Sequence, residues 1–433
     1  MKKIIIVVLS LAIILGFLFW RFGPNLSSQN KDTGPITLTY WGLWEDESII
    51  RPVISQFQQL HPNITINYVR QSSLNYRTRV QTQIREGVGP DVFMIHNSWL
   101  IMFDGDLYPA PANIFSLADY RNLFYPIAEK SFVKNDQIYG ASTEIDGLSM
   151  YVNDDILQGV GGKVPTNWQE FIDTAVRATV KDTTGEIKTA GAAIGTTGNV
   201  DHWSDILGLL LLQQPEVNFN NVATPKVAEV FRFYTGFITD PSKKVWDVTM
   251  PQSTQAFAQG RVLFYFGPSW RAHELRQLNP NLKFTVVPVP RLTGRQIGYS
   301  SFWGQTVSSK SQHPQESWEF VKFLTSEESQ KQMYQLASQT RLFGQPYSLQ
   351  SLTPEIANDP IAGAFVNQGP YYSFWYLSSN TFDAGINDEM IKYFEDGINA
   401  TLQGTDPQVA LQTVNSGVQQ VLQKYTQQAP PSP

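Results

Sequence analysis

The chain has 433 residues, a formal net charge of −6 and no cysteine. Without cysteine, the sequence excludes a disulfide framework, thiolate chemistry and lipoprotein acylation, which needs a cysteine directly after the signal. No basic stripe or cluster of Lys and Arg occurs, which argues against nucleic acid as a partner. The length suffices for two or more lobes that are each held together by a hydrophobic core.

The amino-terminal segment predicts the compartment. Lys2 and Lys3 precede an apolar run over residues 4–20. This run is longer than the roughly 7–15 residues of a secretory h-region and reaches the lower limit of about 17–25 for a spanning helix. No small-x-small cleavage site follows, so residues 1–24 are interpreted as an uncleaved, single-pass signal anchor. The lysines favour export of the rest to the extracellular or periplasmic side of the cell membrane. A cleaved signal peptide is the alternative.

Two further segments lack the apolar content of a folded core. Residues 25–35 contain Gly, Pro, Asn, Ser and Gln, and this composition predicts a flexible tether. Residues 429–433 are polar and proline-rich, which predicts a disordered tail. The folded part is therefore expected between these segments.

The first expected strand leads into an aromatic and acidic loop. Residues 36–40 alternate in the pattern of a half-buried strand, and Trp41, Trp44 and Glu45 follow. Such a loop at the carboxyl end of a strand suits a ligand cleft in an open α/β sheet. The alternative is a pair of tryptophans that packs on a neighbouring helix.

Strands and helices then alternate along the chain. A helical apolar face at 50–60 is followed by an alternating strand at 64–69, a second helix at 76–84 and an apolar strand at 91–95. This order predicts a largely parallel sheet with crossover helices.

The pattern restarts in the second half. Thr166 and Gln169 are interpreted as a capping box before a helix that carries Trp168. Further helices are expected to begin at Pro314 and near residue 406. We expect Trp168, Trp246 and Trp318 in the core.

Several short sequence pieces occur in an order that resembles a known family. They are TLTYWGLWE at 37–45, FQQLHPNITI at 57–66, GVGPDVF at 87–93, QIYGAS at 137–142, MYVNDD at 150–155, VPTNWQEF at 164–171, AFAQGRVLF at 256–264 and SWEFVKFLTSEESQ at 317–330. No single piece is specific, but together they resemble the extracellular solute-binding proteins of ABC importers, in the sugar-binding, maltose-binding-protein-like branch.

The resemblance implies an α/β fold of two lobes with interlobe crossings near 141–146, 286–290 and 325–329. One lobe would comprise residues 36–143 plus 290–325, and the other residues 144–289 plus 326–428. The implied function is to capture a carbohydrate, an oligosaccharide by this resemblance, in the interlobe cleft and to deliver it to an ABC permease. We expect a monomer that is not an enzyme and has no cofactor or metal.

A sugar site needs aromatic plates for the ring faces and carboxylate, amide or guanidinium groups for the hydroxyls. Candidates of these types, mostly in expected loops, are Trp41, Trp44, Glu45, Asn97, Trp99, Glu144, Asp146, Asn199, Trp203, Trp270, Arg271, Trp303, Tyr372 and Trp375. By the resemblance, Asp146 aligns with a sugar-contacting carboxylate. The alternatives are ordinary packing for the aromatic residues and solvation for the carboxylates.

Other functions have weaker support in the sequence. No phosphate-binding loop, nucleophile elbow or zinc-protease motif occurs, and the histidines lack metal-ligand spacing. Glu45 and Asp146 would suit a glycosidase only with carboxyl groups about 5–9.5 Å apart. A polyamine would bind beside carboxylates and aromatic rings, and Tyr371 with Tyr372 would suit ferric ion. A fourth alternative is a ligand sensor that presents its occupied form to a receptor.

Overall fold

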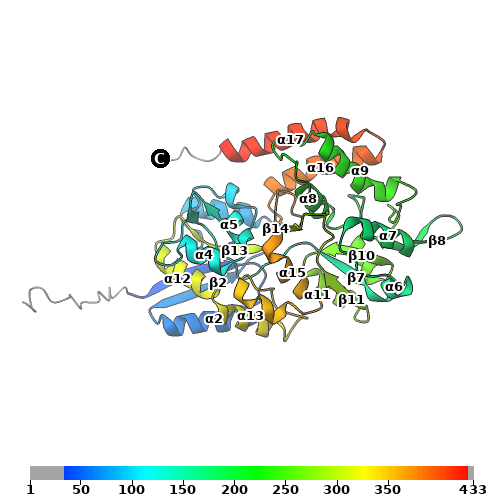
Figure 1. The fold of residues 1–433 in the computed structure, drawn as a ribbon. Coiled ribbons are helices and arrows are strands. Elements are labelled where there is room, and N and C mark those ends of the chain that lie inside the picture. Colours follow the sequence, from blue (N-terminus) through cyan, green and yellow to red (C-terminus); the bar gives the residue numbers. More distant parts are fainter. Residues whose placement is uncertain (1–33, 428–433) are drawn as a thin grey trace, which may run out of the picture.

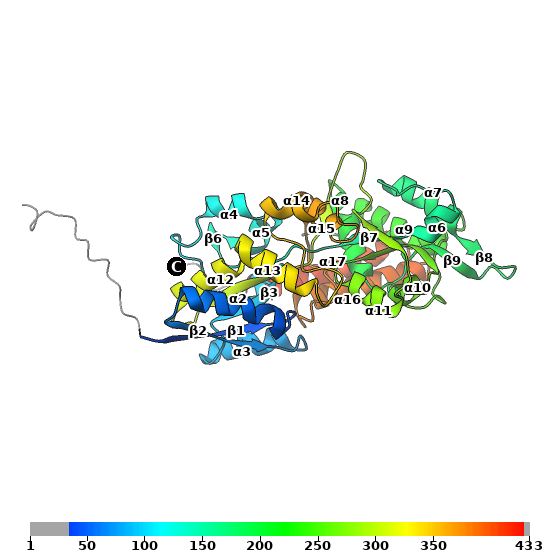
Figure 2. The same ribbon diagram turned by 90° about the horizontal axis from the view of Figure 1, so that it is seen from below.

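The computed structural model describes residues 34–427 and shows two lobes that lie side by side (Figure 1, Figure 2). The predicted anchor at 1–24, almost all of the predicted tether and the predicted tail lie outside the described residues. Within residues 34–427, no helix is long and apolar enough to cross a membrane. The predicted α/β architecture of two lobes is confirmed, since each lobe contains its own five-stranded sheet.

The first lobe is built on one of these sheets. In spatial order its strands are β2 (Ile64–Arg70), β1 (Ile36–Gly42), β3 (Val92–His96), β13 (Trp303–Ser308) and β4 (Leu107–Tyr108). Its helices are α2 (Glu47–Leu60), α3 (Tyr76–Glu86), α4 (Leu117–Leu123), α5 (Pro126–Phe132), α12 (Pro314–Leu324) and α13 (Glu327–Ala337), with the turn η1 (Leu100–Met102) and the hairpin β5 (Val133–Lys134) and β6 (Gln137–Ile138). Strands β1, β2 and β3 run parallel as predicted, and β13 is antiparallel to β3.

Helix α2 shows how the sequence builds this lobe. Asp46 caps the helix, because its carboxylate accepts a hydrogen bond from the Ser48 N–H at 3.0 Å. Val53 and Phe57 recur at helical spacing and are fully buried. The ring of Phe57 meets that of Phe320 in α12 at 5.0 Å. The helix is thereby fixed over the sheet, with its amino terminus next to the loop that carries Trp44.

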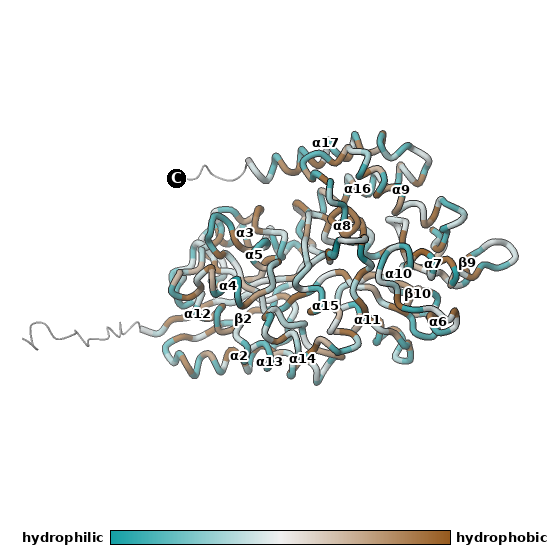
Figure 3. Tube along the Cα trace, viewed as in Figure 1, coloured by the Kyte–Doolittle hydropathy of each residue, from teal (hydrophilic) through white to brown (hydrophobic). Residues whose placement is uncertain are grey.

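The second lobe has the other sheet. In spatial order its strands are β11 (Phe284–Val287), β7 (Ser149–Asn153), β10 (Val262–Gly267), β9 (Ile187–Ala192) and β8 (Val180–Lys181). Its helices are α6 (Asp154–Gly159), α7 (Trp168–Ala178), α8 (Trp203–Gln213), α9 (Pro225–Thr239), α10 (Ser253–Ala258), α11 (Arg271–Leu278), α15 (Gly363–Gln368), α16 (Ile386–Leu402) and α17 (Pro407–Gln427). Every residue of α8 is buried, and its hydrophobic character is visible in Figure 3. Helices α16 and α17 lie along the top of Figure 1.

The predicted capping box of α7 lies one residue further along the chain. Asn167, not Thr166, caps the helix by accepting from the Glu170 N–H, and the Glu170 carboxylate accepts from the Thr166 N–H at 2.8 Å. The helix therefore begins at Trp168. As predicted, Trp168, Trp246 and Trp318 are buried.

Three chain segments lie together between the lobes. Residues 141–148 form the first crossing, and they pair with residues 298–305 and with residues 346–347. The Leu148 N–H donates to the Tyr299 carbonyl, and the Ile145 N–H donates to the Pro346 carbonyl, both at 2.8 Å. Next to them lie the short strands β12 (Gly298–Tyr299) and β14 (Tyr372–Ser373).

The later crossings fall at other positions than the resemblance suggests. The passage expected near 286–290 runs beside the first crossing at residues 298–302. Helix α13 still packs on the first lobe, where the Gln56 amide of α2 donates to Glu328 at 2.5 Å. The turn η2 (Gln350–Leu352) and helix α14 (Thr353–Ile356) follow, and the η3 turn (Gly369–Tyr371) comes directly after α15. Helix α15 packs against β11, so the chain reaches the second lobe after α14.

Candidate ligand-binding site

A cavity of about 390 Å³ lies between the two lobes. Residues from both lobes and from the crossings line it: Trp44, Ser73, His96, Glu144, Asp146, Gly147, Leu148, His202, Asp205, Pro268, Trp270, Ser301, Trp303, Arg341, Gln345, Ser379, Asn380 and Phe382. The volume is in the range of small-molecule sites, and the lining combines aromatic rings with a few polar groups, as such sites do.

The wall on the first lobe is aromatic. Trp303 opens β13 opposite His96, the last residue of β3. Its ring contacts Trp44 at 5.4 Å, His96 at 5.3 Å and Trp99 at 4.9 Å between centroids, all in tilted or edge-on geometry. Such contacts hold the rings in fixed orientations. Trp44 and Trp303 reach the cavity, whereas Trp99 is fully buried behind them.

His96 is neutral and fixed in one tautomer. Burial lowers its pKa to about 3. Its Nδ1 accepts from the Ser98 N–H at 3.3 Å, so Nε2 carries the proton and donates to Ser301 Oγ at 3.0 Å. Ser301 lines the cavity, and its own hydroxyl proton is free to serve a ligand.

Two carboxylates of the first crossing face the cavity. Asp146 Oδ1 accepts from the Gly147 N–H at 2.7 Å, and Oδ2 accepts from the Ser269 hydroxyl at 2.7 Å. Asp146 therefore fastens the crossing to the loop between β10 and α11. Burial raises its pKa to about 7 against the opposing effect of these donors.

Glu144 accepts fewer hydrogen bonds than Asp146. Its Oε1 accepts one long hydrogen bond, from the Trp303 N–H at 3.3 Å. Burial, together with the nearby charges of Asp146 and Glu45, raises its pKa to about 8. The side chain can therefore act as a hydrogen-bond donor or acceptor for a ligand near neutral pH.

The wall on the second lobe is centred on Trp270. This residue precedes α11, and 40% of its surface is exposed. The Arg271 guanidinium lies 4.3 Å from the ring centroid in a cation–π contact, and Arg271 Nε donates to His202 Nε2 at 2.9 Å. The His202 ring contacts the Trp270 ring at 5.8 Å. These contacts hold the indole in place, while 40% of the residue's surface stays exposed.

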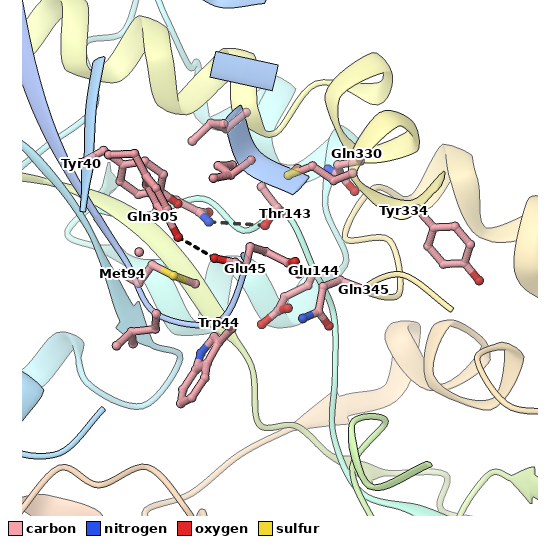
Figure 4. Close-up of a pocket in the computed structure, with 16 residues that line it drawn as sticks. Tyr40, Trp44, Glu45, Met94, Thr143, Glu144, Gln305, Gln330, Tyr334 and Gln345 are labelled. Atoms are coloured by element: carbon pink, nitrogen blue, oxygen red, sulfur yellow. Dashed lines mark hydrogen bonds between the residues drawn. The ribbon is translucent and has the colours of Figure 1, made fainter. Parts of the chain in front are cut away.

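A smaller pocket of about 30 Å³, shown in Figure 4, shares the lining residues Trp44, Glu144 and Gln345 with the cavity. Glu45 forms an ion pair with Arg341 at 2.8 Å, and Gln305 donates to Thr143 at 3.4 Å. The second carboxylate oxygen of Glu45, the side-chain oxygen of Gln305 and the indole N–H of Trp44 are buried and find no hydrogen-bond partner within residues 34–427. These polar atoms can serve groups that a ligand brings.

The structure brings part of the predicted site together. Trp44, Glu144, Asp146, Trp270 and Trp303 line the cavity. Glu45 lines the side pocket shown in Figure 4. Arg271 stands directly behind the cavity wall, since it supports Trp270 and pairs with Glu274 at 2.5 Å.

Other predicted residues lie outside the cavity. Trp41 is buried within β1, and Trp203 is buried at the start of α8. Trp375 is buried with its ring 4.6 Å from Phe219, and Tyr372 is buried in β14. Their side chains pack in the interior.

Two predicted amides form hydrogen bonds that hold loops in place. The side-chain oxygen Oδ1 of Asn97 accepts from the Phe302 N–H at 3.2 Å, which fastens the end of β3 to the second crossing. Asn199 Nδ2 donates to the carbonyls of Asp247 and Met250 at 3.0 and 2.9 Å. These amides have structural partners, and neither lines the cavity.

Several lining residues were not among the candidates, chiefly His96, His202, Asp205, Arg341 and Phe382. His96 ends its strand directly before Asn97, so the rule that ligand residues follow the ends of strands could have included it. His202, Arg341 and Phe382 come from loops far apart in the sequence. No local pattern marks them.

Metal and catalytic readings gain no support from the geometry. Within residues 34–427, no cluster of His, Cys, Asp or Glu could hold a metal ion. Tyr371 and Tyr372 diverge in their surroundings, because Tyr371 is 41% exposed and Tyr372 is buried. Glu45 is paired with Arg341, and Asp146 is bonded to Ser269 on both oxygens.

Two α/β lobes with a polar and aromatic cavity between them define a class of solute-binding proteins that close around their ligands. A model of the family described as bacterial extracellular solute-binding protein matches residues 41–331. The chain therefore belongs to this family, and the family predicted from the sequence is confirmed.

Individual relatives are distant. The chain is similar to the multiple sugar-binding protein of Streptococcus mutans, with 22% identity over 421 residues that cover 86% of this chain and 91% of the relative. A protein of Brucella abortus, named only as a binding protein, is 23% identical over 275 residues, 62% of this chain. The match spans 66% of that relative's own length.

Solved structures share the fold. A cyclo/maltodextrin-binding protein in complex with maltotetraose superposes with a TM-score of 0.73 at 17% identity, covering 90% of this chain and 98% of the other. At this identity the likeness establishes the two-lobe fold and nothing further about the ligand.

Proposed function

We propose that this protein captures a carbohydrate of the oligosaccharide class in the cavity between its lobes and delivers it to an ABC permease. The observation that carries the proposal is the lining of the cavity, in which Trp44 and Trp303 of one lobe and Trp270 of the other share a space with carboxylate, imidazole and guanidinium groups. Indole faces suit the weakly apolar C–H faces of sugar rings, and the polar groups suit the hydroxyls at the ring edge.

The polar groups divide between donors and acceptors. Arg341 and the Ser301 hydroxyl can donate to a sugar oxygen, and Glu144 can bind a hydroxyl in either protonation state. Relatives support the carbohydrate assignment, since one is named a multiple sugar-binding protein and the similar structure holds maltotetraose.

Binding would act through the hinge formed by the crossings. A ligand that touches both walls stabilises the state in which the walls are close, so it shifts the population towards the closed form. The permease would then recognise the closed pair of lobes. In this role the protein acts as a monomer, without catalysis or a cofactor.

We further propose that residues 1–24 stay attached and hold the protein on the outer face of the cell membrane. The support is the sequence alone, namely the apolar run after Lys2 and Lys3. Mass spectrometry of membrane-extracted protein should find peptides from residues 1–33 joined to the folded part. A homogeneous soluble form that starts after residue 24 would contradict the anchor.

Isothermal titration calorimetry tests the ligand class. Maltotetraose, other neutral oligosaccharides and spermidine are titrated into the full chain in detergent. We expect saturable binding of a neutral oligosaccharide. A separate assay of the same mixtures for reducing sugar should show no increase with time. Binding of spermidine alone would favour the second candidate function, a polyamine carrier.

One observation favours that second candidate. Burial and then the nearby charge of Asp146 raise the pKa of Glu144, and a bound cation would offset this repulsion. Trp270 would supply a cation–π face. Against it, the Arg341 and Arg271 guanidinium groups already place positive charge at the cavity.

A further inference from the structure

Residues 379–385 form a strap that joins α16 to the cavity, and its backbone is strained. Asn380, Phe382 and Ala384 have φ values of 57°, 51° and 43°. This left-handed region favours glycine, and for a side chain such as Phe it is rarely occupied. Strained backbone of this kind persists only where surrounding contacts fix it, and it concentrates at functional sites.

The strap is fixed from both lobes. On the second lobe, the Ser379 N–H donates to Asp205 at 3.1 Å. On the first lobe, Arg77 of α3 donates to the carbonyls of Asp383 and Ala384 at 2.5 and 3.2 Å. The strap is therefore held in its strained conformation by hydrogen bonds from both lobes.

A buried carboxylate fixes the same segment from within. Asp383 is fully buried, and it accepts from the Gly385 N–H at 2.8 Å and from the Asn387 side-chain amide at 2.8 Å. The same amide donates to Ser98 of the first lobe at 2.8 Å. These contacts leave the strap one well-defined shape.

This shape places Phe382 at the cavity. The side chain lines the cavity and is 46% exposed. Trp44 and Trp303 pack on each other, whereas Phe382 makes no ring contact with another aromatic residue of the described chain. An apolar ring that is kept at a cavity by strained backbone, with 46% of its surface exposed, gains further contact area when a ligand arrives.

We propose that Phe382 is a specificity-determining aromatic plate, preorganised by the strap 379–385, against which the apolar ring face of a carbohydrate ligand stacks. The inference rests on the proposed function and deepens it. Trp270 and Phe382 are the exposed aromatic rings at the cavity, so a ligand with a ring face is favoured over a linear one. Rigid placement reduces the ordering that binding requires.

Titration of maltotetraose into the full chain in detergent tests the proposal. Phe382→Ala should weaken binding by at least about tenfold, the size expected for a lost aromatic contact. Tyr371→Ala is the matched control, because Tyr371 is exposed to 41% and borders a different pocket. The dissociation constant of Tyr371→Ala should stay within about twofold of the wild-type value. Phe382→Trp keeps an aromatic ring at the cavity, so it should bind maltotetraose as the wild type does.

A second measurement does not depend on the ligand. Phe382→Gly removes both the ring and the strain, so the melting temperature of the empty protein should rise or stay unchanged. A clear fall would mean that the ring stabilises the fold, and would overturn the proposal.

The outcomes separate this inference from the proposed function. If Phe382→Ala binds maltotetraose within about twofold of the wild-type affinity, the proposed role of Phe382 is wrong, but the carbohydrate function is not contradicted. If the wild type binds neither maltotetraose nor another neutral oligosaccharide, the carbohydrate function fails. The proposed stacking of a carbohydrate on Phe382 is then wrong as well, whatever the melting temperatures show about strain in the strap.

Discussion

Trp270 and Trp318 show two uses of the same residue type. Trp270 is 40% exposed at the cavity, whereas Trp318 is fully buried in α12 with its indole N–H donating to the Tyr108 carbonyl at 3.0 Å. In the proposed function Trp270 contributes contact area to a ligand, whereas Trp318 contributes contact area to the core. Substituting each therefore changes a different quantity.

We expect Trp270→Ala to weaken carbohydrate binding by at least about tenfold, since it removes an aromatic plate. The unfolding free energy should change little. Trp318→Ala should instead lower the unfolding free energy by about 3–5 kcal/mol, the usual cost of a lost core tryptophan. Calorimetric titration and thermal unfolding of both variants measure this contrast. Equal destabilisation by the two substitutions would show that Trp270 belongs to the core.

Glu144 predicts a pH dependence of stability. Its pKa is raised from 4.5 to about 8, so the folded protein keeps the proton over a range in which the unfolded chain releases it. Its contribution to stability is therefore complete below about pH 4 and is lost as the pH rises towards 8. We expect Glu144→Gln to raise the melting temperature of the empty protein at pH 8 and to have less effect at pH 5.

The exposed Glu86 provides the control for this experiment. Glu86→Gln should change the melting temperature by the same small amount at both pH values, because the side chain of Glu86 is exposed and folding does not bury it. A pH-independent effect of Glu144→Gln would contradict the raised pKa.

Single residues also show what the sequence could reveal about the site. Trp44 and Trp270 follow recognisable strand and turn signals, so their place at the cavity was predictable. Trp99 has the same signal, but its ring turns into the core behind Trp303. The direction of a side chain in a loop depends on tertiary contacts, which no local pattern encodes.

At the scale of elements, regular segments were predictable and connections were not. The strand β1 and the helices α2 and α12 follow from hydrophobic periodicity and caps. The positions of the crossings depend on the lobe against which each helix packs. Helix α13, for example, packs on α2 of the first lobe. The strap 379–385 has no sequence signal, because positive φ values at Phe382 and Ala384 contradict the residue types.

The strap gives a prediction for backbone strain. Ala384 is exposed and has a φ of 43°, so Ala384→Gly should raise the unfolding free energy by about 1 kcal/mol through relief of strain. Ala400→Gly, within the helix α16, should lower it by about 1 kcal/mol. Chemical denaturation of both variants gives the two values. A loss of stability in Ala384→Gly equal to that in Ala400→Gly would show that the strap is unstrained.

At the scale of the whole molecule, one side chain joins two segments that adjoin the crossings. Gln368 of α15 donates to Ser149 Oγ at 2.7 Å and accepts from the Val289 N–H at 3.2 Å. Its amide thus joins β7, which follows the first crossing, to the segment after β11. Motion of one lobe against the other has to pass through these few segments, which is the arrangement of a hinge.

Small-angle X-ray scattering with and without carbohydrate tests the central claim most directly. A ligand held by both walls should draw the lobes together, so the radius of gyration of the wild type should fall when maltotetraose, or another neutral oligosaccharide that binds in calorimetry, is saturating. Trp270→Ala should need a higher concentration for the same change. An unchanged radius of gyration at saturation would contradict capture by closure of the two lobes.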